Sequence, residues 1–124
     1  MAKVLGIGGV FVKAPDTGAL SAWYGRVLGF PIEEWGGAMW PPPDRGFSIW
    51  SAHKADTTYF DPSPHALMVN LMVDDIDGVL AQAAAEGVEP LGREDGEFGR
   101  FAWLMDPLGV KLELWEPPAD TPEA

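Results

Sequence analysis

The side chains that could do chemistry in this sequence are few, and one carboxylate stands out among them. Glu113 lies in residues 110–115, where aliphatic residues alternate with residues of other kinds. Because successive side chains of a β-strand point to opposite faces, we expect the aliphatic residues on one face and Glu113 on the other, between Lys111 and Trp115. A carboxylate in such a place can act as a general acid or base, or hold a donor group of a ligand. It can equally be paired with a neighbouring cation such as Lys111 or Arg100.

A second predicted strand supplies polar atoms to the same face. In residues 66–73 aliphatic residues again alternate with others, which places Asn70 with Met68 on the side away from the aliphatic residues. An amide on that face can hydrogen-bond a ligand, or be satisfied by nearby backbone groups. Six side chains are predicted to contact a ligand together with Glu113, the candidate catalytic residue: Phe11, Trp50, Met68, Asn70, Arg100 and Trp115.

The place of Arg100 depends on the register of the last hairpin. Residues 106–109 (DPLG) suit a type I turn, and we pair Met105 with Val110 across it. This register puts Arg100 on the ligand face and leaves Trp103 with the core. Arg100 could then hold a carboxylate or phosphate group through two parallel hydrogen bonds, or lie in solvent at the end of the strand.

The elements that would position these side chains begin with a strand–helix unit. A predicted strand at residues 4–13 is rich in Val, Ile and Phe. A helix follows, with Asp16 as its N-cap and Gly29 as its stop. Short strands at residues 38–40 and 47–51 then form a small antiparallel meander.

The second half predicts the same order of elements, with Asp75 or Asp77 capping its helix and Gly87 ending it. This repeat predicts the α+β class and two βαβββ modules, whose strands form one curved mixed sheet around a cup. The expected single domain spans residues 1–117 and has these parts: module one at about 4–51, a connector at 52–64 and module two at about 65–117. A flexible acidic tail should follow at 118–124.

The composition excludes several classes of function. The chain has 124 residues, with 19 acidic and 8 basic side chains and a formal charge of −11. The electrostatic field of this negative charge repels phosphate backbones and anionic lipid headgroups, so neither nucleic acid nor a membrane is an expected partner. The lack of cysteine excludes disulfides and sulfur-ligated metals, and with no signal-peptide pattern we expect a cytoplasmic protein. Both histidines, His53 and His65, are expected to be exposed in or beside the connector.

Three motifs carry a resemblance to a known family. Residues 106–115 (DPLGVKLELW), residues 73–77 (VDDID) before the second helix, and Trp23-Tyr24 ahead of Leu28-Gly29 resemble the vicinal oxygen chelate superfamily. This superfamily includes glyoxalase I, bleomycin resistance proteins and dioxygenases, and the resemblance covers about residues 4–117. It implies the fold predicted above, a small-molecule ligand and a homodimer. It leaves the activity open, because one scaffold hosts lyases, isomerases, dioxygenases and non-catalytic drug-binding proteins.

The resemblance also implies where a metal would be held. Enzymes of the superfamily use one residue from the first strand and one from the last strand of each module. Those positions are Gly9, Met68, about Trp50, and Glu113, of which Glu113 alone suits a hard divalent cation. We therefore predict a protein that binds a small organic molecule without a metal cofactor, with Glu113 as a ligand if a divalent metal is present. The alternative is a lyase, isomerase or dioxygenase that has an atypical metal site or uses Glu113 as acid and base.

Overall fold

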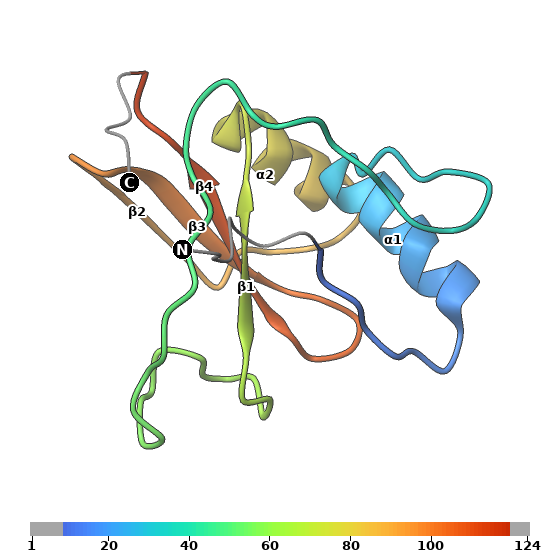
Figure 1. The fold of residues 1–124 in the computed structure, drawn as a ribbon, viewed down its shortest axis with the longest axis horizontal. Coiled ribbons are helices and arrows are strands. Elements are labelled where there is room, and N and C mark those ends of the chain that lie inside the picture. Colours follow the sequence, from blue (N-terminus) through green and yellow to red (C-terminus); the bar gives the residue numbers. More distant parts are fainter. Residues whose placement is uncertain (1–8, 120–124) are drawn as a thin grey trace, which may run out of the picture.

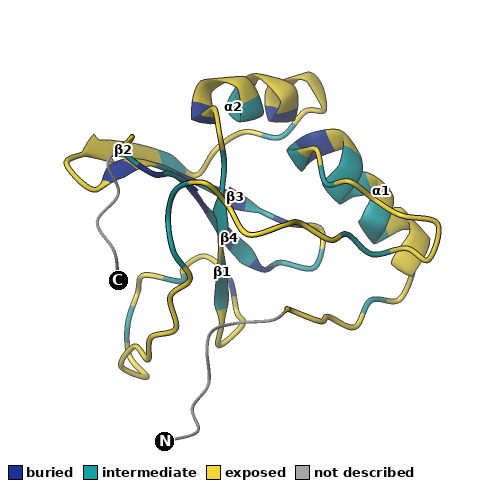
Figure 2. Ribbon diagram, turned by 45° about the horizontal axis from the view of Figure 1, so that its top comes forward, coloured by how far each residue is buried: buried dark blue, intermediate teal, exposed yellow. Residues whose placement is uncertain are grey.

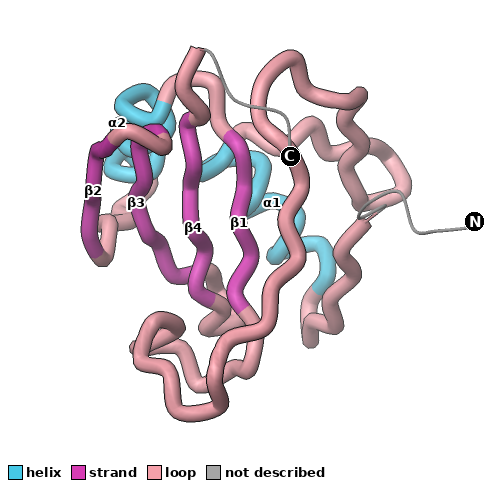
Figure 3. The backbone as a smooth tube through the Cα atoms, turned by 60° about the vertical axis from the view of Figure 1, so that its left-hand side comes forward, coloured by secondary structure: helices cyan, strands magenta, loops and turns pink. Residues whose placement is uncertain are grey.

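The computed structural model describes residues 9–119, and most of its regular structure lies in the second half of the chain. The elements are α1 (Thr17–Leu28), β1 (Met68–Met72), α2 (Ile76–Ala85), β2 (Gly92–Gly96), β3 (Gly99–Met105) and β4 (Lys111–Glu116). The strands form one open sheet in the order β1-β4-β3-β2, as Figure 3 shows. β1 runs parallel to β4, while β2–β3 and β3–β4 are antiparallel. The predicted α+β class with a mixed sheet is confirmed.

Both helices lie on one side of the sheet and leave its other face without a helix (Figure 1). Each helix begins at a capping aspartate: Asp16 accepts from the N–H of Ala19 at 3.0 Å, and Asp75 from the N–H of Gly78 at 3.1 Å. Gly29 ends α1 with a φ of 70°, a left-handed conformation that glycine adopts at little cost. The predicted caps Asp16 and Gly29 are confirmed, and of the two candidates for the second helix Asp75 is the N-cap. Neither helix of the described part has the length and apolar character needed to cross a bilayer.

The hydrophobic core lies between the two helices and the sheet (Figure 2). Its fully buried members come from both helices and from the helix-facing positions of the two central strands: Val27, Ile76, Ala83, Ala102, Leu104 and Leu114. Burying one such aliphatic side chain contributes about 1.5–3 kcal/mol, so this layer holds the helices on the sheet. Gln82 strengthens the contact between the helices by donating to the carbonyl of Val27 at 3.0 Å.

The loop between β3 and β4 has three residues, 107–109, one fewer than the predicted pairing of Met105 with Val110 leaves. Asp106 and Val110 close the turn, because the Asp106 N–H donates to the Val110 carbonyl at 3.0 Å. Met105 therefore pairs with Lys111. Gly109, with a φ of 79°, supplies the left-handed residue that follows a type I turn in three-residue hairpin loops. The register predicted from the sequence is wrong by one residue.

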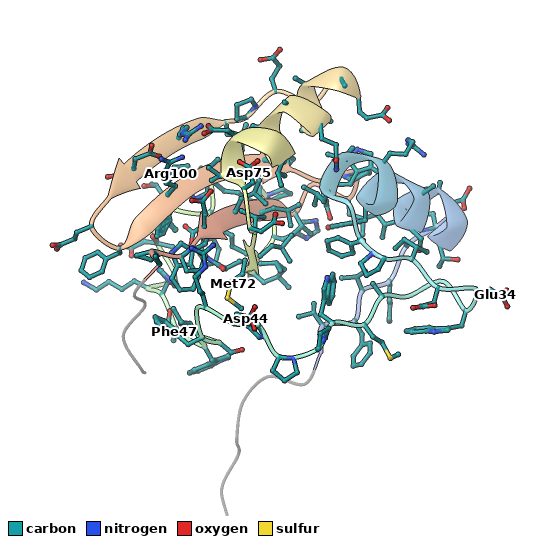
Figure 4. The ribbon with its side chains drawn as sticks, turned by 90° about the horizontal axis from the view of Figure 1, so that it is seen from above. Glu34, Asp44, Phe47, Met72, Asp75 and Arg100 are labelled. Atoms are coloured by element: carbon teal, nitrogen blue, oxygen red, sulfur yellow. The ribbon has the colours of Figure 1, made fainter. Side chains whose placement is uncertain are left out.

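This shift exchanges the two faces of β3, because a slip of one residue moves every side chain to the opposite side. In the structure Ala102 is buried against the helices, while Phe101 and Trp103 lie on the helix-free face. Arg100 was predicted on the ligand face, and this placement is wrong. Its Nη1 atom lies 3.2 Å from Oδ2 of Asp77, on the side of α2 as Figure 4 shows.

A buried carboxylate holds the turn in place. Oδ1 of Asp106 accepts from the N–H groups of Leu108 at 2.8 Å and Val110 at 2.9 Å. Its Oδ2 accepts from the hydroxyl of Tyr24 at 2.6 Å, although 82 residues separate the two in sequence. Burial and the neighbouring carboxylate of Asp106 raise the pKa of Tyr24 above its usual range. This contact ties α1 to the β3–β4 turn.

The first predicted module is only partly formed. α1 is present, but no strand forms at residues 9–13, 38–40 or 47–51, and Ile32 and Ala38 make one isolated bridge. Within the described residues these three predicted strands are wrong; residues 4–8 and 120–124 lie outside the described part. A strand satisfies its backbone groups by pairing, and among residues 9–119 these segments find no partner strand. Apolar side chains such as Phe11 and Trp50 consequently remain exposed.

Removing the hydroxyl of Tyr24 should destabilise the fold. In Tyr24→Phe the buried Asp106 loses a hydroxyl donor, so we expect the free energy of unfolding to fall by about 1.5–3 kcal/mol, the usual worth of a hydrogen bond to a charged group. Urea unfolding followed by tryptophan fluorescence measures this. The matched control is Tyr59→Phe at a more exposed carboxylate contact, where we expect a loss of about 1 kcal/mol or less. Equal losses in the two variants would contradict a special role for Asp106.

Candidate functional site

The helix-free face of the sheet gathers polar and aromatic side chains around one position. Glu113 lies near the middle of β4, and its register partners are Asn70 on β1 and Trp103 on β3. Residues paired across neighbouring strands point to the same face, so these three side chains lie side by side. The sheet itself therefore brings an acceptor and two donors together.

The carboxylate of Glu113 accepts hydrogen bonds from three different segments of the chain. The Asn70 amide donates to Oε1 at 2.8 Å, and the Trp103 indole N–H donates to Oε2 at 2.9 Å. The hydroxyl of Tyr59, from the connector, also donates to Oε2. A carboxylate offers about four lone-pair positions, so most of the acceptor capacity of Glu113 is used. The cluster fixes the orientation of the Trp103 ring.

Tyr59 is held against the sheet by a second contact. Nζ of Lys111 donates to the Tyr59 carbonyl at 2.6 Å and lies 5.2 Å from the centre of its ring. Its phenol packs edge-on against Trp103, with ring centres 6.3 Å apart. Burial of the phenol, reinforced by its bond to Glu113, raises the pKa of Tyr59 to about 12. At neutral pH Tyr59 is therefore a hydrogen-bond donor to Glu113.

A row of aromatic rings runs across the same face. Phe101 stacks between Trp103 and Trp115, with ring centres 6.4 Å and 6.3 Å apart and small angles between the ring planes. Phe47 covers Trp115 from outside at 5.1 Å, and Tyr59 covers the other end of the row. The middle of the row is left partly open.

A hollow of about 220 Å³ lies at this open part of the row. It lies over β2 and β3 and is lined by Tyr59, Glu94, Gly96, Phe98, Gly99, Phe101 and Trp103. Its volume is below the roughly 300–1,000 Å³ of sites that enclose a whole drug-sized molecule. It therefore suits one ring system or one substituent of a larger ligand.

A larger depression of about 950 Å³ lies along the outer side of α1. Its walls come from α1 and from residues 12–14 and 30–37, and Arg26 is its one charged lining residue. Arg26 pairs with Glu86 at 3.7 Å. Because it lacks a cluster of directed polar groups, this depression is a weaker candidate than the sheet face.

The structure brings together four of the seven predicted site residues. Met68, Asn70, Glu113 and Trp115 share the helix-free face, as the alternation of the strands predicted. Trp115 is covered there rather than open, with 5% of its surface exposed. Contact of these residues with a ligand stays a prediction.

The other three predicted residues lie elsewhere. Phe11 and Trp50 are 96% and 79% exposed and do not join the cluster around Glu113. Arg100 lies on the helix side, as described above. The shared cause for Phe11 and Trp50 is that the strands expected to carry them are not formed, so nothing directs their side chains to the sheet face.

Sequence reasoning missed Tyr59, Trp103 and Phe101 as members of the site. Trp103 and Phe101 were missed because of the one-residue register error. Tyr59 lies in the connector, where a strand-alternation argument has nothing to act on. The signal that could have found Trp103 is Gly109, since a glycine in the left-handed position is typical of the three-residue loop seen here.

The donors around Glu113 do not fit a divalent metal. Within residues 9–119 no group of three or more His, Cys, Asp or Glu side chains comes together. At the positions that the resemblance assigns, Gly9 has no donor atom, Met68 offers a soft thioether, and Trp50 points into solvent. Glu113 is occupied by hydrogen-bond donors, which compete with a cation for the same lone pairs.

The two histidines contribute no ligand to this cluster either. His53 contacts the hydroxyl of Ser51 at 3.3 Å and stacks on the ring of Tyr59. Nε2 of His65 lies 2.9 Å from the carbonyl of Leu108. Both side chains are exposed, as predicted.

The chain belongs to the glyoxalase-like domain family, whose sequence profile matches residues 9–115. This confirms the resemblance to the superfamily of glyoxalases, bleomycin resistance proteins and dioxygenases. No curated protein matches the sequence.

Solved structures share the fold. TnmS3, an antibiotic-binding protein from Streptomyces sp. CB03234, is 21% identical; the match covers 86% of this chain and 91% of that chain with a TM-score of 0.54. A member of the glyoxalase/bleomycin resistance protein/dioxygenase superfamily from Sphaerobacter thermophilus DSM 20745 is also 21% identical. It covers 85% of this chain and 91% of that chain with a TM-score of 0.50. At this identity the likeness establishes the fold.

The two tyrosines should titrate late in the folded protein. The chain has 2 tyrosines, and in both the folded pKa is raised above the unfolded value of about 10. We therefore expect no phenolate absorbance from the native protein near pH 10, and in Tyr24→Phe a single transition near pH 12 from Tyr59. Glu113→Gln removes the nearby negative charge, so it should lower the pKa of Tyr59. A native tyrosine that titrates at about 10 would contradict this.

The same shift predicts how stability changes with pH. Because the folded protein holds the Tyr59 proton more tightly than the unfolded chain, this contribution to stability is complete below about pH 10. It should be lost as the pH rises towards about 12. Urea unfolding in Tyr24→Phe and in Tyr24→Phe/Tyr59→Phe measures it: the first variant should lose stability more steeply in this range than the second.

Proposed function

We propose that this protein binds a small organic molecule on the helix-free face of its sheet and does so without a divalent metal. The observation that carries the proposal is the open middle of the aromatic row, where Phe101 and Trp103 line a hollow beside the hydrogen-bonded carboxylate of Glu113. Apolar walls with a few directed polar groups are the usual make-up of a ligand site.

In the proposed site each group has a role. The rings of Phe101 and Trp103 offer faces on which a planar ligand can stack, which is worth about 0.5–1.5 kcal/mol per ring pair beyond the area buried. The bond from Trp103 to Glu113 holds the indole in place before a ligand arrives. A surface ordered in advance loses less conformational entropy on binding. In TnmS3 the same fold belongs to an antibiotic-binding protein, which supports this use of the scaffold.

A second candidate function is proton transfer by Glu113 in a metal-free enzyme of the family, such as a lyase or isomerase. The observation that favours it is the contact between the Tyr59 hydroxyl and the Glu113 carboxylate, because the pair could pass a proton to and from a bound substrate. Turnover of any substrate that is abolished in Glu113→Gln, with ligand binding retained, would support this candidate over a binding protein.

We also propose that the protein is a homodimer. Large apolar side chains of the first half are exposed, among them Val10, Phe11, Trp35, Trp40 and Trp50. Extended apolar surface of this kind is often an interface. A mass near twice 13.4 kDa in light scattering is the expected result, and a concentration-independent monomer would overturn this proposal.

Metal loading tests the metal-free part of the proposal. After dialysis against Mg, Mn, Fe, Ni and Zn salts and removal of the excess, elemental analysis should find far less than one equivalent per chain, because Glu113 alone cannot chelate a cation. A stoichiometric metal that is lost in Glu113→Ala would overturn it. The same metal retained in Glu113→Ala would also overturn it, and would place the site elsewhere.

Binding at the aromatic row is tested with naphthylmethanol, a neutral two-ring probe. Its addition should shift the Trp103 indole N–H signal in a ¹H–¹⁵N spectrum in a saturable way. Phe101→Ala removes one stacking face and should weaken binding about 3–10-fold. The matched control is Trp35→Ala, a ring that is 68% exposed on the α1 side and should leave the affinity unchanged. Equal effects of the two variants would contradict the aromatic row as the site.

A further inference from the structure

One carboxylate on the rim of the hollow has no role in the cluster around Glu113. Glu94 lies on β2 opposite Phe101, so its side chain shares the helix-free face with that ring. Its neighbours on the same face of β2 are Gly92 and Gly96, which have no side chains to cover it. A Cβ at Gly96 would meet no atom within 4 Å. Glu94 and the ring faces therefore border the same open space.

No cation of the described residues forms an ion pair with Glu94. Arg93 points to the helix side, where it pairs with Asp77 at 2.5 Å and Asp95 at 3.2 Å, and Arg100 also pairs with Asp77. Lys111 donates to the carbonyl of Tyr59, and its Nζ lies 5.9 Å from the centre of the Trp103 ring. Both arginines of the β2–β3 hairpin are thus paired on the helix side, and Lys111 lies beside the hollow without forming an ion pair with Glu94.

The negative charge of Glu94 acts across the hollow. Tyr59, which lines the same hollow, has a raised pKa chiefly because of burial and its bond to Glu113, and the charge of Glu94 adds a smaller contribution. The aromatic walls also favour a cation, because the face of an indole or phenyl ring carries partial negative charge. The net charge of −11 adds a long-range field of the same sign.

We propose that the ligand of this hollow is an organic cation: an aromatic ring system that carries an amine, with its ring on Phe101 and Trp103 and its ammonium group beside Glu94. This inference rests on the proposed ligand-binding function and names the class of ligand. The ring and the amine together match the small volume of the hollow and Glu94, the one carboxylate among its described lining residues. An anionic analogue would meet Glu94 without a countercharge and would be rejected.

Three probes that share one ring system test the charge preference: naphthylmethylamine, which is a cation at neutral pH, naphthylmethanol, which is neutral, and naphthoate, which is an anion. Each is titrated into the full chain while the Trp103 indole N–H signal is followed. The amine should bind about tenfold more tightly than the alcohol, from the ring and carboxylate attractions of an exposed site. Naphthoate should bind more weakly than the alcohol.

The variant Glu94→Gln tests whether Glu94 causes the preference for the cationic probe. It should weaken binding of the amine about three- to fivefold, the range of exposed ion pairs, and leave the alcohol unchanged. The matched control is Glu97→Gln, an exposed residue of the same hairpin outside the hollow, which changes the net charge equally. It should leave the affinities for both probes unchanged.

The variant Gly96→Leu tests whether the amine binds in the hollow. Gly96 does not have a positive φ and has open space around it, so leucine fits the backbone and fills the hollow. Binding of the amine should fall in this variant, and an unchanged affinity would overturn the assignment. The folded state of each variant is checked by the dispersion of its ¹H–¹⁵N spectrum.

The outcomes separate this inference from the function on which it rests. If the three probes bind equally, or if Glu94→Gln acts no differently from Glu97→Gln, the cation preference is overturned while ligand binding at the aromatic row stands. If no probe moves the Trp103 signal, the proposed ligand-binding function is overturned and the inference with it. A cation preference that high salt does not reduce would also contradict a partly exposed ion pair.

Discussion

The position of β3 on β4 depends on the buried carboxylate of Asp106. By accepting from two backbone N–H groups of the turn and from Tyr24 on α1, it fixes a loop in which Gly109 takes the left-handed position. This loop length decides which side chains of β3 face the helices. With Trp103 on the helix-free face, the indole meets Glu113; one residue of slip would bury it and expose the core.

Two tyrosine–carboxylate contacts of the same chemistry have different consequences in this protein. The contact of Tyr24 with Asp106 is largely buried and joins a helix to a turn, so its effect is on stability. The contact of Tyr59 with Glu113 is partly exposed and joins the connector to the open face of the sheet. It leaves Glu113 at the centre of a surface that solvent and ligands can reach, and its effect is on the shape of that surface.

The two sides of the hairpin formed by β2 and β3 also differ in charge. Both arginines of this hairpin turn to the helix side and pair with aspartates there, while Glu94 lies alone on the aromatic side. The strict alternation of side chains along a strand produces this separation. The described residues therefore combine ring faces and a carboxylate without an ion pair in one place, which is the basis for the ligand class proposed above.

The sequence by itself determined the α+β class, the family, both caps of the first helix, and the placement of Asn70 and Glu113 on one face of the sheet. Each of these follows from sequence motifs, local chemistry or the alternation of side chains along a strand. For the second helix it left the N-cap open between Asp75 and Asp77. It did not determine the face of β3, since a single left-handed glycine in the turn changes the register and moves Trp103 and Arg100 to opposite sides. Nor did it show that Tyr59 completes the cluster or that the strands expected around Phe11 and Trp50 lack partners. Those features depend on pairing between segments far apart in the chain, and only the tertiary structure decides which segments meet.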